Sequence, residues 1–346
     1  MARRRRTIRK KKGFGAAWVL RAAFFLLLLA AGAAAWLVFA PFGPSKETFV
    51  EVAPGSSTLS IGRQLEAEGV VRSQFAFYLV RWWKRGTLKA GEYRFDHPAA
   101  VTEVYARIER DDVFTLPVTV REGANIFEIA ARLEQAGLGS RQDFLDAAAR
   151  DVSLVADLDP RATSLEGYLF PDTYRFARKA TPEQICAAMV RRFRQAARQL
   201  GLKGNVHEVV TMASLVERET AVGAERPLVA SVFENRLARK MPLMTDPAVI
   251  YGLELDRRWT GTIHESDLQF NTPYNTYLHA GLPPGPIANP GLESLRAAMS
   301  PARTGYLYFV AAGANPQGRS MFSSTLLEHA RDVANYRHAV KKAGPS

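Results

Sequence analysis

Cysteine is nearly absent from this chain of 346 residues, because Cys186 is the only one. An intrachain disulfide is therefore excluded, and the apolar helical pattern around Cys186 favours a buried small side chain over a catalytic thiol. The six histidines form no His-Glu-x-x-His zinc motif, since His207-Glu208 and His264-Glu265 each lack the second histidine. A Gly-x-Ser-x-Gly elbow and a phosphate-binding Gly-Lys-Ser/Thr loop are also missing. The sequence thus supports no metal, cofactor, acyl-transfer triad or nucleotide dependence.

Acidic residues are missing from the first 21 positions, which carry nine of the 46 Lys and Arg residues. The remaining chain has 37 basic and 34 acidic residues, so the net charge of +12 belongs mainly to this basic tail. A nearly balanced folded part argues against a nucleic-acid partner.

Residues 22–40 contain no charge, and as a helix they span roughly 28 Å, about one hydrocarbon core. Trp18 and Trp36 lie near the two ends, as interfacial anchors do, and Pro41 and Pro44 stop the helix. We predict a transmembrane helix with its basic side in the cytoplasm. A cleaved signal peptide is the alternative, but the run is long for a signal core and no clear cleavage site ends it.

Residues 41–48 are predicted to form a short linker, and residues 49–150 contain a weak internal repeat. Val52-Ala53-Pro54-Gly55 and Val120-Arg121-Glu122-Gly123 each begin a predicted strand, glycine turn and apolar-periodic helix. The second copy, continuing to Ala130, resembles a LysM module, and such modules bind N-acetylglucosamine polymers. A small α/β packing unit without a ligand explains this degenerate pattern equally well.

The composition changes from about residue 150, and Leu165–Tyr174 is dense in aromatic and turn-forming residues. A helix is predicted from Pro182 to about Leu200, and the next begins near His207. We therefore predict an α+β protein with these parts in order: a basic tail (1–21), a single transmembrane helix (22–40), a linker (41–48), LysM-like small α/β modules (49–150), a larger α+β domain (151–340) and a tail (341–346).

An acidic run, Ala213–Thr220, ends one of these helices. Glu217 and Glu219 lie there at the edges of a hydrophobic stripe, where desolvation can keep a carboxyl group protonated near neutral pH. Cleavage of a glycosidic bond requires such a proton donor. Two residues apart, the side chains diverge by about 200°, so they cannot both reach one atom. From this run alone, ordinary boundary carboxylates paired with Arg218 or Arg226 are the favoured interpretation.

The loops downstream are rich in Tyr, Asn, Thr, Gly and Pro, which offer the aromatic faces and neutral hydrogen-bonding groups that sugars need. Several separated motifs in fixed order closely resemble the endolytic murein transglycosylases of the MltG/YceG-like family. They are Leu165–Tyr174, Ala213–Thr220, Thr245–Gly252, Tyr274–Tyr277, Gly281–Gly291 and Tyr306–Val310. The resemblance covers essentially the whole chain.

The resemblance implies a lyase that cleaves the bond between N-acetylmuramic acid and N-acetylglucosamine in peptidoglycan, without a metal or cofactor. It implies that residues 151–340 form the catalytic domain and that Glu217, the first glutamate of the run, is the catalytic acid. Glu219 would support it. The candidate substrate contacts are Tyr274, Asn275, Thr276, Asp246 and Asn235, for which structural hydrogen bonding in turns is an equal alternative.

The resemblance also implies a place in the bacterial inner membrane, with the N-terminus cytoplasmic and the catalytic domain outside, acting on nascent glycan strands and terminating their elongation. Peptidoglycan synthases are candidate partners. A different class of function remains open: a non-catalytic, membrane-tethered scaffold that binds peptidoglycan. A hydrolase that uses water is a further alternative.

Overall fold

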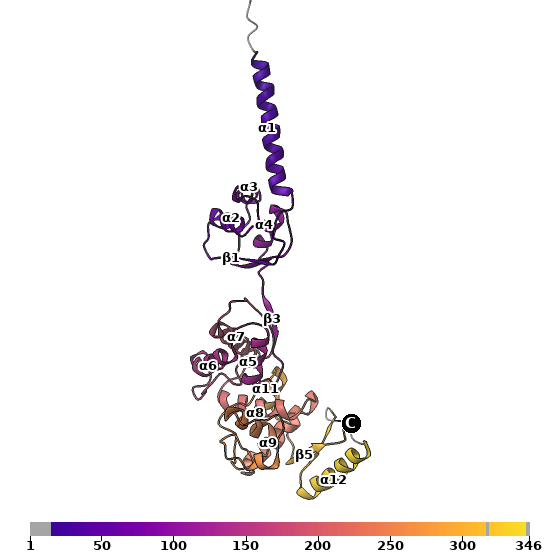
Figure 1. Cartoon of the computed structure of the whole chain (residues 1–346). Helices are drawn as coiled ribbons and strands as arrows, with labels where there is room; N and C mark the ends of the chain where they lie inside the picture. Colours follow the sequence, from indigo (N-terminus) through magenta and orange to yellow (C-terminus); the bar gives the residue numbers. More distant parts are fainter. Residues whose placement is uncertain (1–14, 316–317, 344–346) are drawn as a thin grey trace, which may run out of the picture. The chain divides into compact units, whose positions relative to one another are not determined.

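The computed structural model describes residues 15–315 and 318–343, which divide into two compact units between Thr115 and Leu116 (Figure 1). The predicted mixed α+β class is confirmed in its coarse form, since the described chain is mostly helical with small two-stranded antiparallel sheets and one N-terminal apolar helix. Residues 1–14 of the predicted basic tail and residues 344–346 of the predicted C-terminal tail lie outside the described residues.

Unit 1 packs three short helices against a two-stranded sheet. Its elements are α1 (Ala16–Phe39), β1 (Thr48–Val52), α2 (Thr58–Ala67), α3 (Gln74–Lys84), β2 (Gly91–Phe95) and α4 (Val101–Glu109). The alternating pattern of β1 places Val50 opposite Tyr93 of β2, and both are fully buried. Together with Phe77 of α3 and Tyr105 of α4 they form one hydrophobic core.

The last turn of α1 belongs to this core, because Val38 is buried in it. The predicted linker is also tied down: Phe42 and Ala99 exchange two backbone hydrogen bonds of 3.0 Å. The Arg72 guanidinium lies 4.0 Å from the centre of the Trp36 ring and donates a hydrogen bond to the Pro41 carbonyl. The end of α1 is therefore fixed to unit 1.

Helix α1 is the one described helix that is long and apolar enough to cross a membrane, with a mean hydropathy of 2.4 over Ala17–Phe39. It begins six residues before the predicted span of 22–40, because Arg21 continues the helix instead of preceding it. It ends at Phe39, one residue before the predicted end, because Ala40 is extended before Pro41. A membrane anchor and a signal sequence both have this length and composition.

Unit 2 is mainly helical. Its elements are β3 (Leu116–Thr119), α5 (Ile126–Gln135), α6 (Arg141–Arg150), η1 (Val152–Leu154), β4 (Thr173–Phe176), α7 (Pro182–Leu200), α8 (Val206–Glu219), η2 (Gly223–Glu225), α9 (Arg226–Ala238), α10 (Asp246–Leu255), η3 (Glu265–Gln269), α11 (Leu292–Met299), β5 (Tyr308–Ala311), β6 (Ser320–Ser323) and α12 (Leu326–Ala343). Helix α7 has the predicted bounds, because a Thr181–Gln184 capping box starts it and Gly201 in the left-handed region ends it.

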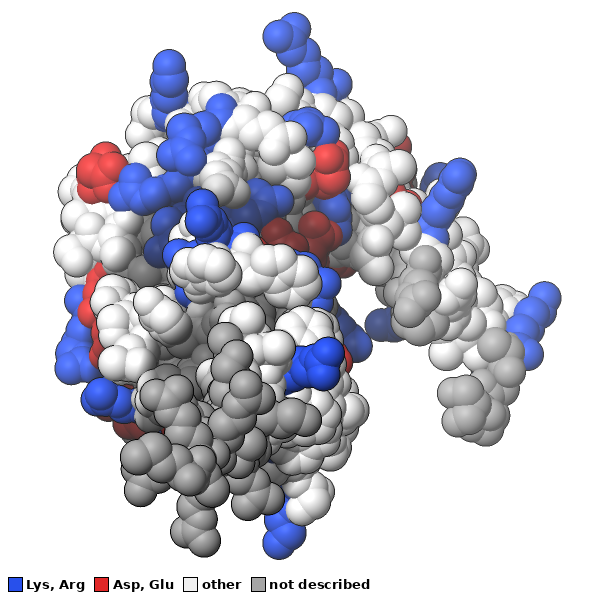
Figure 2. Space-filling view, turned by 90° about the horizontal axis from the view of Figure 1, so that it is seen from above, with Lys and Arg blue, Asp and Glu red and all other residues white. Residues whose placement is uncertain are grey.

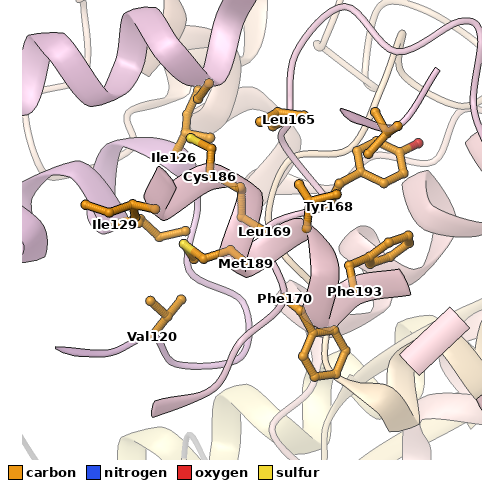
Figure 3. Close-up of a cluster of buried hydrophobic side chains, with 14 of the residues drawn as sticks. Val120, Ile126, Ile129, Leu165, Tyr168, Leu169, Phe170, Cys186, Met189 and Phe193 are labelled. Carbon is orange, nitrogen blue, oxygen red and sulfur yellow. The ribbon is translucent and has the colours of Figure 1, made fainter. Parts of the chain in front are cut away.

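The division between the units differs from the predicted boundary near residue 150. Strand β3 pairs with β4, which lies more than fifty residues further on, with Leu116 opposite Phe176. The second repeat copy therefore buries its apolar residues in the core of unit 2, where Val120 and Ile129 join Tyr168 and Phe193 (Figure 3). Glycan binding by a LysM-like region stays a prediction.

Two hydrophobic cores in unit 2 share helix α8. Val210 and Ala213 belong to the first core, with Cys186 and the residues of Figure 3. Leu215 and Val216 belong to the second core, which α9 and α10 complete. Burial raises the pKa of the Cys186 thiol to about 12, as expected for an inert apolar site. Because both cores include residues of α8, the C-terminal end of this helix lies at the edge of both.

The charge of the chain after residue 21 is nearly balanced, with 37 basic and 34 acidic residues. On the face that Figure 2 shows, Lys and Arg side chains occupy much of the surface, and Asp and Glu side chains lie among them.

Candidate functional site

The C-terminal end of α8 carries both candidate acids. Asn205 caps the start of the helix by accepting a hydrogen bond from the Glu208 amide, and the helix stops at Glu219 because Thr220 is extended. Eight residues between Val206 and Val216 are buried, so the core fixes the rotation of the helix. Glu217 and Glu219 consequently point into different surroundings.

Glu217 is held by strong partners on both carboxylate oxygens. Its Oε1 accepts a hydrogen bond of 2.8 Å from Arg226 Nη2, and its Oε2 accepts one of 2.8 Å from the Gly291 amide. The side chain of Glu217 is only 5% exposed and that of Arg226 only 11%. The contact with Arg226 is a buried, charge-assisted hydrogen bond.

The backbone around Glu217 comes from three distant segments. Gly123 adopts a left-handed φ of 77° in the loop before α5, and a side chain there would approach Glu217 Cγ to 3.4 Å. The Gly123 amide donates to the Asn289 carbonyl, while Arg218 donates to the Gly123 carbonyl at 3.0 Å. Glu217 thus joins α8 to the loop before α5 and to the Gly281–Gly291 loop.

Glu219 lines a cavity of about 450 Å³ on the other side of the helix end. The polar groups that share this wall come from α9, the start of α10, the loop after η3, β5 and α12; they are Arg236, Thr245, Asp246, Tyr277, Tyr308 and His329. The cavity also has an apolar wall that includes Phe233, Leu243 and Phe309. It therefore combines aromatic faces with a few converging polar groups, as ligand sites commonly do.

Burial, and then the nearby charge of Asp246, raise the pKa of Glu219 to about 7, although Arg236 opposes the shift. Asp246 is the first residue of α10, and its Oδ1 accepts a hydrogen bond of 2.6 Å from the Tyr277 hydroxyl. The two carboxyl groups therefore differ. Glu219 can carry a proton near neutral pH, while Asp246 accepts a hydrogen bond from the Tyr277 hydroxyl.

Arg236 forms the basic side of the cavity, and the backbone holds it in place. Its Nε donates to the Leu307 carbonyl at 2.7 Å, and its Nη1 donates to the Leu243 carbonyl at 2.8 Å. The guanidinium also lies 5.4 Å from the centre of the Tyr308 ring. Burial lowers the pKa of Arg236. The hydrogen bonds of Arg236 go to backbone carbonyl groups. Its charge lowers the pKa of Glu219, but burial and Asp246 outweigh it and the net shift is upward.

The predicted site residues are thus separated into groups. Glu219 and Asp246 line the same cavity, whereas Glu217 and the other predicted contacts do not. Asn275 is fully buried and donates to the Leu268 and Phe270 carbonyls at 3.0 and 2.8 Å. Thr276 is also buried, and its Oγ1 accepts a hydrogen bond from the Thr245 amide. These contacts are the structural turn roles that the sequence left open.

Tyr274 and Asn235 also make internal contacts. The Tyr274 ring packs edge-on against Tyr251, with ring centres 5.0 Å apart. Asn235 donates through Nδ2 to the Thr304 and Tyr306 carbonyls, both at 2.9 Å. Asn235 therefore fastens α9 to the segment before β5.

Sequence reasoning missed Arg236, Tyr308 and His329 in the cavity, and also the buried carboxyl of Glu166. Glu166 is 2% exposed, and burial raises its pKa to about 8 although Ile126 and Asn289 donate hydrogen bonds to it. The unusual density of Leu165–Tyr174 was the available signal for Glu166. Among residues 15–315 and 318–343, no group of His, Cys, Asp and Glu side chains is arranged to hold a metal ion.

This chain is similar to known proteins of one family over most of its length. The profile of the YceG-like family matches residues 50–335. A Bacillus subtilis (strain 168) protein named endolytic murein transglycosylase is 34% identical over 314 residues, which cover 83% of this chain and 84% of that protein. A Streptococcus pneumoniae (serotype 2, strain D39) protein of the same name is 29% identical, and the match covers 84% of this chain but only 58% of that longer protein.

A crystal structure of a yceG-like protein from Listeria monocytogenes has a similar fold. It is 30% identical to this chain, with a TM-score of 0.54, and the match covers 83% of this chain and 99% of the other. The described cavity and both glutamates of α8 lie within the residues that the family profile matches.

Proposed function

Because this chain belongs to the YceG-like family, we propose that it is a membrane-anchored endolytic transglycosylase that cleaves glycan strands of peptidoglycan. The name that its relatives carry, endolytic murein transglycosylase, supports the reaction class, which is that of a lyase. The bond cleaved is the one between N-acetylmuramic acid and N-acetylglucosamine.

One observation carries the choice of acid: Glu219 faces a cavity and has a pKa of about 7. A general acid works best when its pKa is near the working pH, because it must hold a proton and also release it. Glu217, by contrast, has an arginine and a backbone amide on its two oxygens. We therefore propose Glu219 for proton transfer, and Glu217, which the sequence resemblance implies as the catalytic acid, stays the alternative.

The reaction then needs one carboxyl group for two steps. Protonated Glu219 donates to the glycosidic oxygen, and positive charge develops at C1 of the muramic acid residue. The Glu219 carboxylate next accepts the proton of the 6-hydroxyl of the same sugar, and that oxygen attacks C1. A 1,6-anhydro ring closes, the bond to the leaving sugar is broken, and no water is consumed.

Asp246 has the position to assist this reaction. Its negative charge both favours the proton on Glu219 and would stabilise the positive charge at C1. The hydrogen bond from Tyr277 orients the Asp246 carboxylate, and the aromatic rings of the cavity offer surfaces for sugar C–H groups. Asp246 is thus the second residue that we expect to matter for the rate.

The apolar helix α1 supports a location of this protein at the membrane. Nine basic residues and no acidic ones lie within the first 21 positions, so by the positive-inside rule we expect the N-terminus in the cytoplasm and the chain after α1 outside it. An anchored enzyme meets glycan close to the membrane, where strands grow. This supports action on nascent strands and the ending of their elongation.

Product analysis of the unchanged chain and two variants tests the proposal. The purified full chain in detergent is incubated with peptidoglycan, and the released ends are identified by mass spectrometry. We expect 1,6-anhydro ends, lighter by one water than hydrolase products. Glu219→Gln should release none, while Glu234→Gln on exposed surface should match the unchanged chain. Release of ordinary reducing ends would indicate a hydrolase, and no release by any form would support the scaffold alternative.

A further inference from the structure

Helix α3 of unit 1 is apolar on both of its faces. Its inner face, Ala76, Phe77 and Val80, is buried in the core of unit 1. Its outer face has the same helical spacing but lies in solvent: the exposed fractions are 70% for Phe75, 52% for Tyr78, 42% for Leu79, 64% for Trp82 and 62% for Trp83. A surface helix normally keeps polar residues on its outer side, and a contiguous apolar patch of this kind marks an interaction surface.

The outer face is continuous with α1. Ala34, Ala35 and Phe39 of α1 and Leu79, Trp82 and Trp83 of α3 line one hollow whose exposed surface is entirely apolar. The two helices lie side by side at the end of α1 (Figure 1). Because Val38 is buried in the core and Arg72 packs against Trp36, this arrangement is fixed within unit 1.

The rise per residue of an α-helix gives the depth at which α1 and α3 residues would lie in a membrane. Trp18 and Trp36 are eighteen residues apart, about 27 Å along α1, which is close to the thickness of the hydrocarbon core. If α1 spans the membrane, Trp36 lies at its outer boundary and Ala34 and Ala35 lie just inside it. The indole rings of Trp82 and Trp83, which share a hollow with Ala34 and Ala35, then reach the same level. Tryptophan prefers that level of a bilayer.

The charges on and around α3 also match a bilayer surface. Residues 69–91 contain five basic residues, Arg72, Arg81, Lys84, Arg85 and Lys89, and no acidic residue. Lys84 and Arg85 are exposed at the end of the helix. A helix with an exposed aromatic face and nearby basic residues can bind a membrane by burying that face among lipid chains and pairing its cations with anionic headgroups.

We propose that α3 lies in the outer interface of the membrane, with Phe75, Tyr78, Leu79, Trp82 and Trp83 inserted at the boundary between headgroups and lipid chains. This proposal rests on the anchor role proposed for α1. It makes unit 1 a two-point attachment, because α1 sets the position of the unit and α3 sets its tilt.

Depth-dependent fluorescence quenching tests this contact. The chain has five tryptophans, so replacing Trp18, Trp36 and Trp259 with Phe leaves emission from Trp82 and Trp83 alone. The full-length variant is reconstituted into vesicles of phosphatidylethanolamine and phosphatidylglycerol, with bromine atoms placed either near the headgroups or at the chain ends. We expect a large loss of emission with the shallow bromines and a much smaller loss with the deep ones, relative to unbrominated vesicles.

A companion variant separates this test from a failure of the anchor. It keeps Trp18 alone, which reports whether α1 is inserted. Quenching of Trp18 without quenching of Trp82 and Trp83 would overturn the α3 proposal and leave the anchor intact. Absence of quenching for Trp18 would overturn both. A blue-shifted Trp82/Trp83 emission that depends on protein density and ignores bromine would overturn the proposal in favour of a second copy covering the face.

Discussion

The two sides of the end of α8 carry the same residue type in opposite environments. On one side, Arg226 and the Gly291 amide occupy both oxygens of Glu217. On the other, Glu219 faces a cavity beside a second carboxylate, and its pKa rises to about 7. The comparison shows that two glutamates only two residues apart on one helix can have very different surroundings, and such differences decide how readily a carboxyl group keeps its proton.

The largest expected effect is on catalysis. Glu219→Gln keeps the size of the side chain but cannot cycle a proton, so we expect the rate of anhydro-end formation to fall by about 10²- to 10⁴-fold. Glu217→Gln should lower the rate far less. The rates are measured by quantifying anhydro-ended fragments over time. If Glu217→Gln abolishes product and Glu219→Gln does not, the assigned roles are exchanged and the prediction from the resemblance is correct.

The next effect is on stability, and it belongs to the Glu217 side. Glu217→Ala leaves the Arg226 charge without its buried partner, and we expect the free energy of unfolding to fall by about 3–5 kcal/mol. Glu217→Ala/Arg226→Met should recover much of this loss, because no unpaired charge remains. Denaturant unfolding of the full chain in detergent measures both. Equal destabilisation by the single and double variants would argue against the ion pair as the cause.

The Glu219 side predicts a change of the opposite sign. The folded pKa of Glu219 lies above its ordinary value of 4.5, so stability is lost as the pH rises from there to about 7 and stays lower above it. Glu219→Gln cannot ionise, and at pH 8 we expect it to raise the free energy of unfolding by up to about 3 kcal/mol. At pH 4 the two forms should be alike. Glu234→Gln, on the exposed side of α9, should show no such pH dependence.

The smallest expected effect sharpens the cause of the raised pKa. The reaction needs protonated Glu219, so the rate should decline as the pH rises above about 7. Asp246→Asn removes a charge that raises the pKa of Glu219, and we expect the decline to begin at a lower pH. A pH–rate profile of the two forms measures this shift. An unchanged midpoint in Asp246→Asn would mean that burial alone sets the proton affinity.

Much of this arrangement could be predicted from local sequence patterns. Apolar periodicity located α7 and α8, and the helical repeat correctly required Glu217 and Glu219 to diverge. The choice between them depends on Arg226, Gly291 and Asp246, which only tertiary folding brings to α8. The resemblance pointed to Glu217, and that assignment stays a prediction beside the one proposed here.

The two compact units divide between Thr115 and Leu116, and the predicted domain boundary near residue 150 stays a prediction. The second repeat copy looks like the first along the chain, but Leu116 of β3 pairs with Phe176 of β4, and this distant pairing is invisible to periodicity. The side-chain chemistry of Asn275 and Thr276 makes them predicted substrate contacts. Both side chains are buried, and burial depends on how the whole chain packs, which local sequence does not show.

The position of α8 between two cores has a consequence for how this enzyme can change. Val210 and Ala213 pack on one side and Leu215 and Val216 on the other, so a substitution within this stretch disturbs two packed regions at once. Glu219, the last residue of α8, belongs to neither core, whereas Glu217 is held by its pair with Arg226. A library of random substitutions in α8 should therefore yield folded proteins more often from position 219 than from Glu217 or the buried stretch, so altered reactivity can be selected there without rebuilding the protein.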